Sequence, residues 1–130
     1  MTEYSTNNRL AASCIRIAEE LEAHANSRAY TDENGNVVIL DGDDEPSDEM
    51  EYRGLYDFIN DAIDIEVTCC LSGDYRGAKL YMTVGSPTIW VDTQTGFVEG
   101  RWATDSCSKW VDSDAIDALN EAIEEIVQDM

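Results

Sequence analysis

The sequence predicts an α+β fold: a four-stranded antiparallel sheet with two N-terminal helices and a C-terminal helix. Apolar residues recur at helical spacing near both ends of the chain. Between them, short runs of alternating apolar and polar residues are joined by short turns, as in an antiparallel meander. With 130 residues, 43% of them hydrophobic, the chain can bury one core, so we expect a single domain over 1–130.

The first predicted helix begins at Ser5 or Thr6, either of which can cap it, and ends near Asn26. Its apolar residues repeat every three or four positions and form a stripe that should face the core. The stripe consists of Leu10, Cys14, Ile15, Ile17, Ala18 and Leu21.

A turn and a short strand follow the first helix. Asn34-Gly35 is a strong turn signal, so Val37–Leu40 is predicted to be a short strand or one arm of a hairpin. The stretch 41–51, DGDDEPSDEME, then carries seven acidic residues and no base. Its glycine and proline predict an acidic loop at about 41–48.

The second predicted helix spans Asp48–Ala62, with Ser47 or Asp48 as its N-cap. Asp48, Glu49 and Glu51 would lie in its first turn, where carboxylates suit the positive end of the helix dipole. Its core-facing residues would be Met50, Leu55, Phe58, Ile59 and Ala62.

The second half of the chain predicts the sheet and the last helix. The expected strands are 64–71, 78–84, 87–93 and 97–102. Asp112 or Ser113 caps a helix that runs to the C-terminus, with apolar residues on one side. Since no base follows Lys109, the acids on the opposite side have no partner within the helix; they are Asp114, Asp117, Glu121, Glu124 and Glu125.

Charge excludes more function classes than any motif. The chain has 28 acidic and 8 basic residues, a formal net charge of −20. Such a charge repels nucleic acid and anionic membranes, so direct DNA binding is excluded and a strongly basic partner is favoured. We found no apolar run long enough to cross a bilayer and no signal peptide, and therefore expect a cytoplasmic protein.

Catalytic and metal-binding patterns are weak. The single histidine, His24, has no cysteine at ligand spacing and makes neither a zinc site nor a catalytic triad. The sequence VGSPT at 84–88 lacks the G-x-S-x-G pattern, and no glycine-rich phosphate loop is present. The segments 32–43 and 41–52 resemble EF-hand loops only in part. We therefore predict no enzyme activity, no catalytic residues, no metal site and no cofactor.

The four cysteines predict free thiols. Cys14, Cys69, Cys70 and Cys107 are too scattered for a disulfide framework. Adjacent residues of a strand point to opposite faces, so the pair at 69–70 cannot act together like a C-x-x-C motif. Buried or half-buried thiols in a reducing compartment are the simpler interpretation.

The acids can imitate the phosphate backbone of nucleic acid. Duplex DNA carries about one charge per 1.7 Å of axis, and acids every three or four residues on a helix give one about every 5 Å. A small, single-domain, very acidic chain of this kind resembles the DNA-mimic inhibitors of phages and mobile elements, both antirestriction and anti-CRISPR proteins. That resemblance is one of charge and size, and it carries no site residues over.

A second resemblance covers about residues 55–130. The segments LYDFINDAIDIEV and GSPTIWVDTQTGFVEGRW look like those of a set of small proteins from gut-bacterial phages and mobile elements. It implies a phage or mobile-element origin without implying an activity. The chain departs from the pattern of that set at Ser86-Pro87-Thr88, where Gly-Pro-Asn is typical.

The sequence thus predicts a non-enzymatic inhibitor in the host cytoplasm that occupies a basic nucleic-acid-binding site of a bacterial defence protein, such as a CRISPR effector or a restriction enzyme. The alternatives are an accessory interaction module, arranged as a homodimer through Tyr75, Trp90, Trp102 and Trp110, and a divalent-metal-binding protein. An acidic surface that only keeps the protein soluble is the simplest competing interpretation. The expected partner-binding residues are Asp41, Asp43, Asp44, Glu45, Asp48, Glu49, Asp114, Asp117, Glu121, Glu124 and Glu125.

Overall fold

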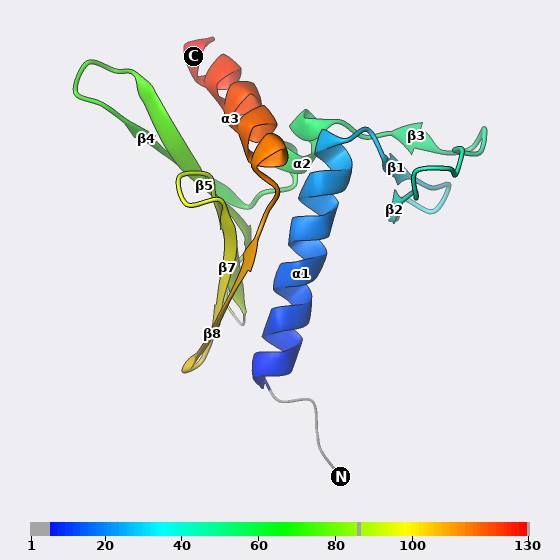
Figure 1. The fold of residues 1–130 in the computed structure, drawn as a ribbon, viewed down its shortest axis with the longest axis horizontal. Coiled ribbons are helices and arrows are strands. Elements are labelled where there is room, and N and C mark those ends of the chain that lie inside the picture. Colours follow the sequence, from blue (N-terminus) through cyan, green and yellow to red (C-terminus); the bar gives the residue numbers. More distant parts are fainter. Residues whose placement is uncertain (1–5, 86, 130) are drawn as a thin grey trace.

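A computed structural model describes residues 6–85 and 87–129 of the chain. The predicted cap at Ser5 and the departure at Ser86 lie outside this part. A five-stranded antiparallel sheet forms one layer and three helices form the other (Figure 1). In this described part, no helix has the length and apolar character that a bilayer crossing requires.

The large sheet is an antiparallel meander in sequence order. Its strands are β4 (Asp64–Cys69), β5 (Tyr75–Thr83), β6 (Thr88–Asp92), β7 (Phe97–Trp102) and β8 (Asp105–Trp110). Leu80 pairs with Val91, and Val91 with Val98, so these apolar side chains line one face of the sheet. Gly96, with a φ of 80°, allows the tight turn between β6 and β7.

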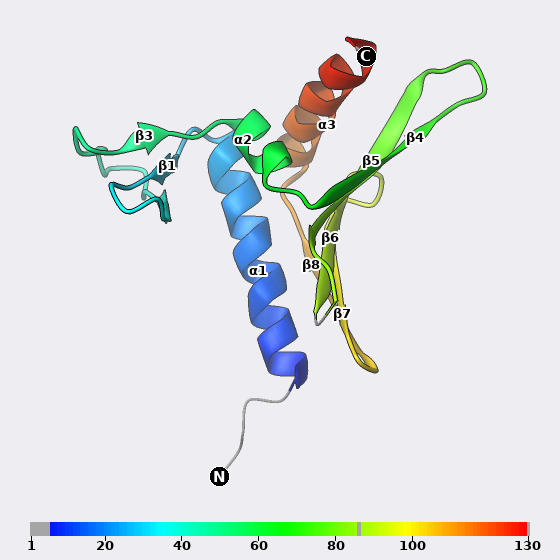
Figure 2. The same cartoon turned by 180° about the vertical axis from the view of Figure 1, so that it is seen from behind.

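Two helices cover the same face of this sheet, and their contacts form the core. The long helix α1 (Thr6–Ala25) packs on β7 and β8, and α3 (Ser113–Gln128) packs on β5 and α1. Leu10 and Cys14 of α1 reach the backbone of Gly100, where an added Cβ would lie 2.8 Å from each side chain. Neither ribbon view shows a helix on the other face of the sheet (Figures 1 and 2).

The start of α3 is held by α1. Asp112 precedes the helix, as predicted, although its side chain makes no capping hydrogen bond. Instead its backbone N–H donates to the Glu22 carboxylate, at 2.9 Å. The apolar side of α3 is buried as its periodicity predicts; Ala115, Ile116, Leu119, Ala122 and Ile123 are its buried residues.

A second, three-stranded sheet projects from the end of α1 on the side away from the large sheet (Figures 1 and 2). Its order is β2 (Val37–Ile39), β1 (Ala29–Thr31) and β3 (Glu51–Tyr52). Gly35, with a φ of 84°, provides the turn between β1 and β2, so the predicted hairpin is confirmed. The acidic loop joins β2 to β3, which are the two edge strands of this sheet.

The predicted second helix is much shorter than expected. α2 spans only Leu55–Asn60, because Glu51–Tyr52 is extended and pairs with β1. The Tyr52 ring packs edge-on against Tyr30, with ring centroids 5.8 Å apart. Consequently Asp48, Glu49 and Glu51 do not occupy the first turn of a helix; Asp57 does so, and its carboxylate accepts the Gly54 N–H.

The predicted sheet was also wrong in its strand count. The α+β class is correct, but the large sheet has five strands and the small sheet adds three. The missed strand β8 has the polar sequence DSCSKW, and it pairs with β7 along its full length. β5 begins at Tyr75 rather than at 78, so the hairpin with β4 is longer than predicted.

Candidate binding surface

The helix α3 carries the most ordered group of acids. All five predicted residues are exposed on the side opposite the core; they are Asp114, Asp117, Glu121, Glu124 and Glu125. From the first to the last they extend about 16 Å along the helix axis. The only ion pair within the described residues joins Arg53 to Asp61, so these five carboxylates face solvent without a basic partner.

The arrangement of these acids is unfavourable for the helix itself. Glu121 lies four residues after Asp117, three before Glu124 and four before Glu125, and like charges at these spacings destabilise a helix. The acids at 124 and 125 also lie near the negative end of the helix dipole, and the last turn contains no base to offset them. The helix is therefore held by its buried apolar side, against the repulsion on its exposed side.

One of the five acids has a contact outside the helix. The Tyr56 hydroxyl of α2 donates a hydrogen bond to the Glu125 carboxylate. This bond and the neighbouring negative charge raise the pKa of Tyr56, because both favour the protonated phenol. The Glu125 carboxylate is thus held in place by a side chain of α2, although it remains exposed.

The acidic loop presents a second group of carboxylates. Its six predicted residues are all exposed; they are Asp41, Asp43, Asp44, Glu45, Asp48 and Glu49. Two backbone hydrogen bonds shape the loop: the N–H of Asp44 donates to the Asp41 carbonyl at 3.0 Å, and that of Met50 to the Ser47 carbonyl at 3.1 Å. Helical order, which the sequence predicted from residue 48, is absent from this loop.

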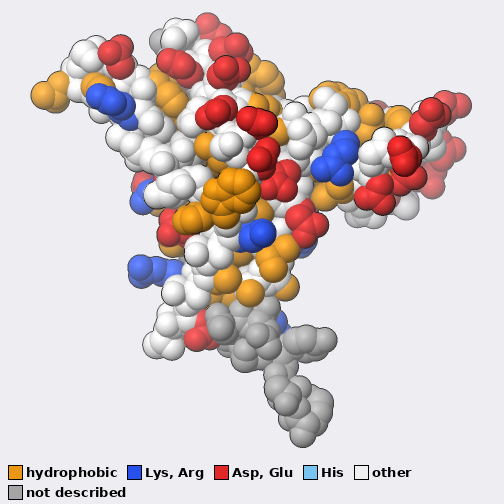
Figure 3. Space-filling model, viewed as in Figure 1, with side chains coloured by type: hydrophobic (Ala, Val, Ile, Leu, Met, Phe, Trp, Pro, Cys, Tyr) orange, Lys and Arg blue, Asp and Glu red, His pale blue; other side chains and the backbone are white. Residues whose placement is uncertain are grey.

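The fold does not join the two acidic groups into one cluster. The loop lies on the small sheet and α3 lies over the large one, with the end of α1 and α2 between them (Figures 1 and 2). One face of the molecule nevertheless displays both groups, with further Asp and Glu side chains between them (Figure 3). A partner that contacts both would have to extend across this whole face.

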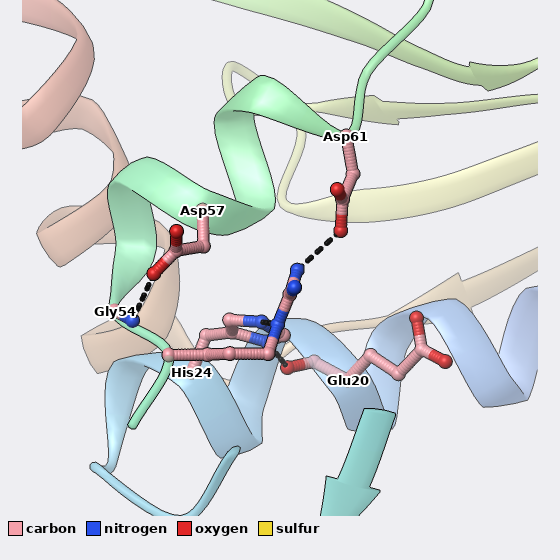
Figure 4. A network of polar contacts seen from close by, with 6 residues as sticks. Glu20, His24, Gly54, Asp57 and Asp61 are labelled. Carbon is pink, nitrogen blue, oxygen red and sulfur yellow. Dashed lines mark hydrogen bonds and ion pairs between the residues drawn. The ribbon is translucent and has the colours of Figure 1, made fainter. Parts of the chain in front are cut away.

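A partly buried polar network joins the end of α1 to α2 (Figure 4). His24, only 3% exposed, donates from Nδ1 to the Glu20 carbonyl, and its Nε2 accepts a hydrogen bond from Arg53 Nε at 3.0 Å. Arg53 also pairs with Asp61 at the end of α2. Burial lowers the pKa of His24, and the Arg53 charge lowers it further, so the ring is neutral at physiological pH. The histidine thus lies in the last turn of α1 and is held in structural contacts within the fold.

The four aromatic residues named for the alternative homodimer contact are mostly engaged within the fold. The Tyr75 hydroxyl donates to Asn120 at 2.6 Å, Trp90 Nε1 donates to Glu99 at 3.2 Å, and Trp102 packs against the core. Trp110, at 54% exposure, remains open to solvent. The four aromatics therefore do not form one continuous interface patch.

Neither a metal cluster nor a known relative guides the functional assignment. Within residues 6–85 and 87–129, no three His, Cys, Asp or Glu side chains are grouped so that they could hold a metal ion. Comparisons with protein-family models, with curated proteins and with solved structures find no match. We therefore infer the function from the chemistry of the surface.

Proposed function

We propose that this protein is a non-enzymatic inhibitor that binds the basic nucleic-acid-binding site of another protein, with α3 as the central contact. The supporting observation is the row of exposed carboxylates on α3, which no base of the helix neutralises. The acidic loop at 41–49 widens the negative surface on the same face. A CRISPR effector is the first candidate target, and a restriction enzyme is the second.

A rigid helix suits this role better than a loop does. Four of its acids follow one another at intervals of three or four residues, which is about 4.5–6 Å along the axis. The helix is clamped by its buried side and by the bond from Asp112 to Glu22, so its backbone loses little further entropy on binding. Lys and Arg side chains of a nucleic-acid channel can meet such a row as they would meet phosphates.

The repulsion within α3 also favours a binding role over simple solubility. Acids that only solvate a protein can be spread over its surface, where they repel one another less. Here they are concentrated on one face of a helix and near its negative end, at a cost to stability. A cationic partner would convert that repulsion into attraction.

The test is competition for nucleic acid. A labelled DNA duplex is bound to a purified CRISPR effector, and its release by the full-length protein is followed by fluorescence anisotropy. In the test variant, Asp114, Asp117, Glu121 and Glu124 are changed to Lys. Because the like charges keep the same spacing, the repulsion along the helix does not increase and the helix should remain folded. The variant should nevertheless fail to release the duplex. If it competes as well as the wild type, α3 is not the mimic. If the wild type releases no duplex from the effector or from a restriction enzyme, the proposed function is wrong.

The matched control reverses the same number of charges on the acidic loop. Changing Asp41, Asp43, Asp44 and Glu45 to Lys alters the net charge equally. If α3 is the central contact, this variant should compete much better than the helix variant. Equal loss in both variants would show a response to net charge alone.

A further inference from the structure

An apolar groove lies between α3 and the edge strand β4, away from the acidic side of the helix. Its volume is about 480 Å³. In both ribbon views the β4–β5 hairpin diverges from the C-terminal half of α3 (Figures 1 and 2). Six aliphatic residues are among those that line it, with Ile63, Ile65 and Val67 on the strand side and Ile123, Ile126 and Val127 on the helix side; the polar residues Asn60 and Asp64 border it as well.

The strand side of the groove exposes large apolar side chains that the fold does not cover. Ile63 is 65% exposed and Val67 is 40% exposed. With Ile65 between them, they occupy alternate positions from just before β4 into the strand, so the three form a continuous stripe rather than scattered residues. A stripe of this kind beside a groove marks a site of interaction more often than single exposed residues do.

β4 is also an unpaired edge. Within the described part of the chain it hydrogen-bonds to β5 alone, so alternate residues offer free backbone groups along its outer edge beside the groove. A segment that adds to such an edge places alternate side chains on each face of the sheet. Those on one face would enter the groove between β4 and α3.

The opposite face of β4 is acidic. Asp64 and Glu66 stand beside Tyr81 and Lys79 of β5 in the ladder, whereas Ile65 stands beside buried Leu80. An added strand would therefore meet aliphatic side chains on one face and carboxylates on the other. The groove also adjoins the last turn of α3, which has a negative dipole end and no base.

The charges on β4 favour a basic strand over a second copy of this chain as the segment that binds there. If two copies of this chain paired through β4 in a register that places Asp64 opposite Glu66, they would bring like charges together across the ladder, which is destabilising. The net charge of −20 on each copy adds to that repulsion. A strand with Lys or Arg at alternate positions would instead form favourable cross-strand pairs with the same carboxylates.

We propose that β4 accepts an extended segment of a basic partner, in which aliphatic residues alternate with Lys or Arg. The segment adds as a sixth strand, fills the groove with its aliphatic side chains and contacts Asp64 and Glu66 with its cations. The proposal rests on the proposed function, since it identifies how the same basic partner would be anchored beside α3.

The test uses a labelled peptide of about six residues, matching the length of β4, that alternates Lys with Val or Ile. Binding to the full-length protein is measured by anisotropy, and hydrogen exchange of the backbone amides is followed by NMR. We expect saturable binding, slower amide exchange in β4, and at least about tenfold weaker binding by the variant Ile63→Ser/Val67→Ser. Because both side chains are substantially exposed, this variant should fold normally.

Two controls separate the contributions of shape and charge. Leu71→Ser removes a fully exposed aliphatic residue outside the groove lining and should leave binding unchanged. A peptide with Glu in place of Lys should not bind, because Asp64 and Glu66 would repel it. Equal binding of the two peptides would overturn the charge argument.

Further outcomes would overturn the proposal. These are an absence of peptide binding, unchanged β4 exchange, or undiminished binding by the groove variant. A dimer in light scattering that the groove variant abolishes would assign the site to a second copy instead. The peptide experiment needs no nucleic-acid-binding protein, so its failure is distinct from a failure of the competition assay. If duplex competition by the groove variant equals that of the wild type while the helix variant fails, the proposed function stands without the groove.

Discussion

Removing one charge from the middle of α3 should make the protein more stable. Glu121 lies at repulsive spacing from Asp117, Glu124 and Glu125, and each such pair costs about 0.2–0.5 kcal/mol. Glu121→Gln removes all three pairs with nearly the same helix propensity, so the free energy of unfolding should rise by about 0.6–1.5 kcal/mol. For a domain of this size that corresponds to an increase in Tm of about 2–7 °C.

Thermal unfolding followed by circular dichroism at low salt measures this difference. Glu33→Gln is the matched control, since it removes one exposed charge from a turn outside the helices. At about 1 M salt the Debye length falls to about 3 Å, so the advantage of Glu121→Gln should shrink toward that of the control. A variant that is no more stable than the wild type at low salt, or whose gain persists at high salt, would refute the idea that these acids repel one another.

Three further predictions concern the core. Because the pKa of buried His24 is lowered, the unfolded chain binds its proton more readily, so the free energy of unfolding should fall as pH drops below about 6.5. His24→Gln should flatten this part of a Tm-against-pH profile. An unchanged slope would contradict a buried, neutral His24. Burial, with a smaller contribution from the Cys107 thiol, raises the pKa of Cys14 to about 12. At pH 8 a thiol reagent should therefore modify exposed Cys69 and reach Cys14 only on unfolding. Rapid modification of Cys14 in the folded protein would show that α1 is not packed as described. Gly100→Ala places a Cβ 2.8 Å from two α1 side chains and should lower the free energy of unfolding, measured with denaturant, by about 1–3 kcal/mol. Gly42→Ala, with nothing within 4 Å of the added Cβ, should lower it much less. Equal losses would argue against the close contact between Gly100 and α1.

The elements that the sequence predicted well have a strong local period. α3 has an apolar stripe opposite an acidic one, and its position at Ser113–Gln128 agrees with the prediction. The strand Phe97–Trp102 was predicted with its exact bounds from a turn and an alternating run. In both cases the residues that face the core also set the local pattern, so periodicity and burial agree.

The missed elements depend on pairing with distant residues. Asp105–Trp110 has no apolar alternation, and it is a strand because β7 pairs with it and α1 packs on it. Likewise, Glu51–Tyr52 is extended because it pairs with Tyr30 and Thr31, about twenty residues earlier in the chain. Helix propensity over 48–62 was overridden by that pairing, which no local pattern indicates.

The two parts of the candidate surface were predictable to different degrees. All eleven predicted acids are exposed, because charged residues without partners are rarely buried. Their separation in space, and the groove beside β4, could not be predicted. Both depend on how α3, the large sheet and the small sheet are placed relative to one another, and on Ile63 and Val67 remaining uncovered.

The most direct test of the central claim is the salt dependence of binding to the target. The dissociation constant of the complex with a CRISPR effector would be measured over a series of salt concentrations. We predict that log Kd rises steeply with log salt concentration for the wild type, and that the α3 charge-reversed variant shows little binding at any salt. A wild-type affinity that is insensitive to salt, or a variant that binds as tightly as the wild type, would contradict the account.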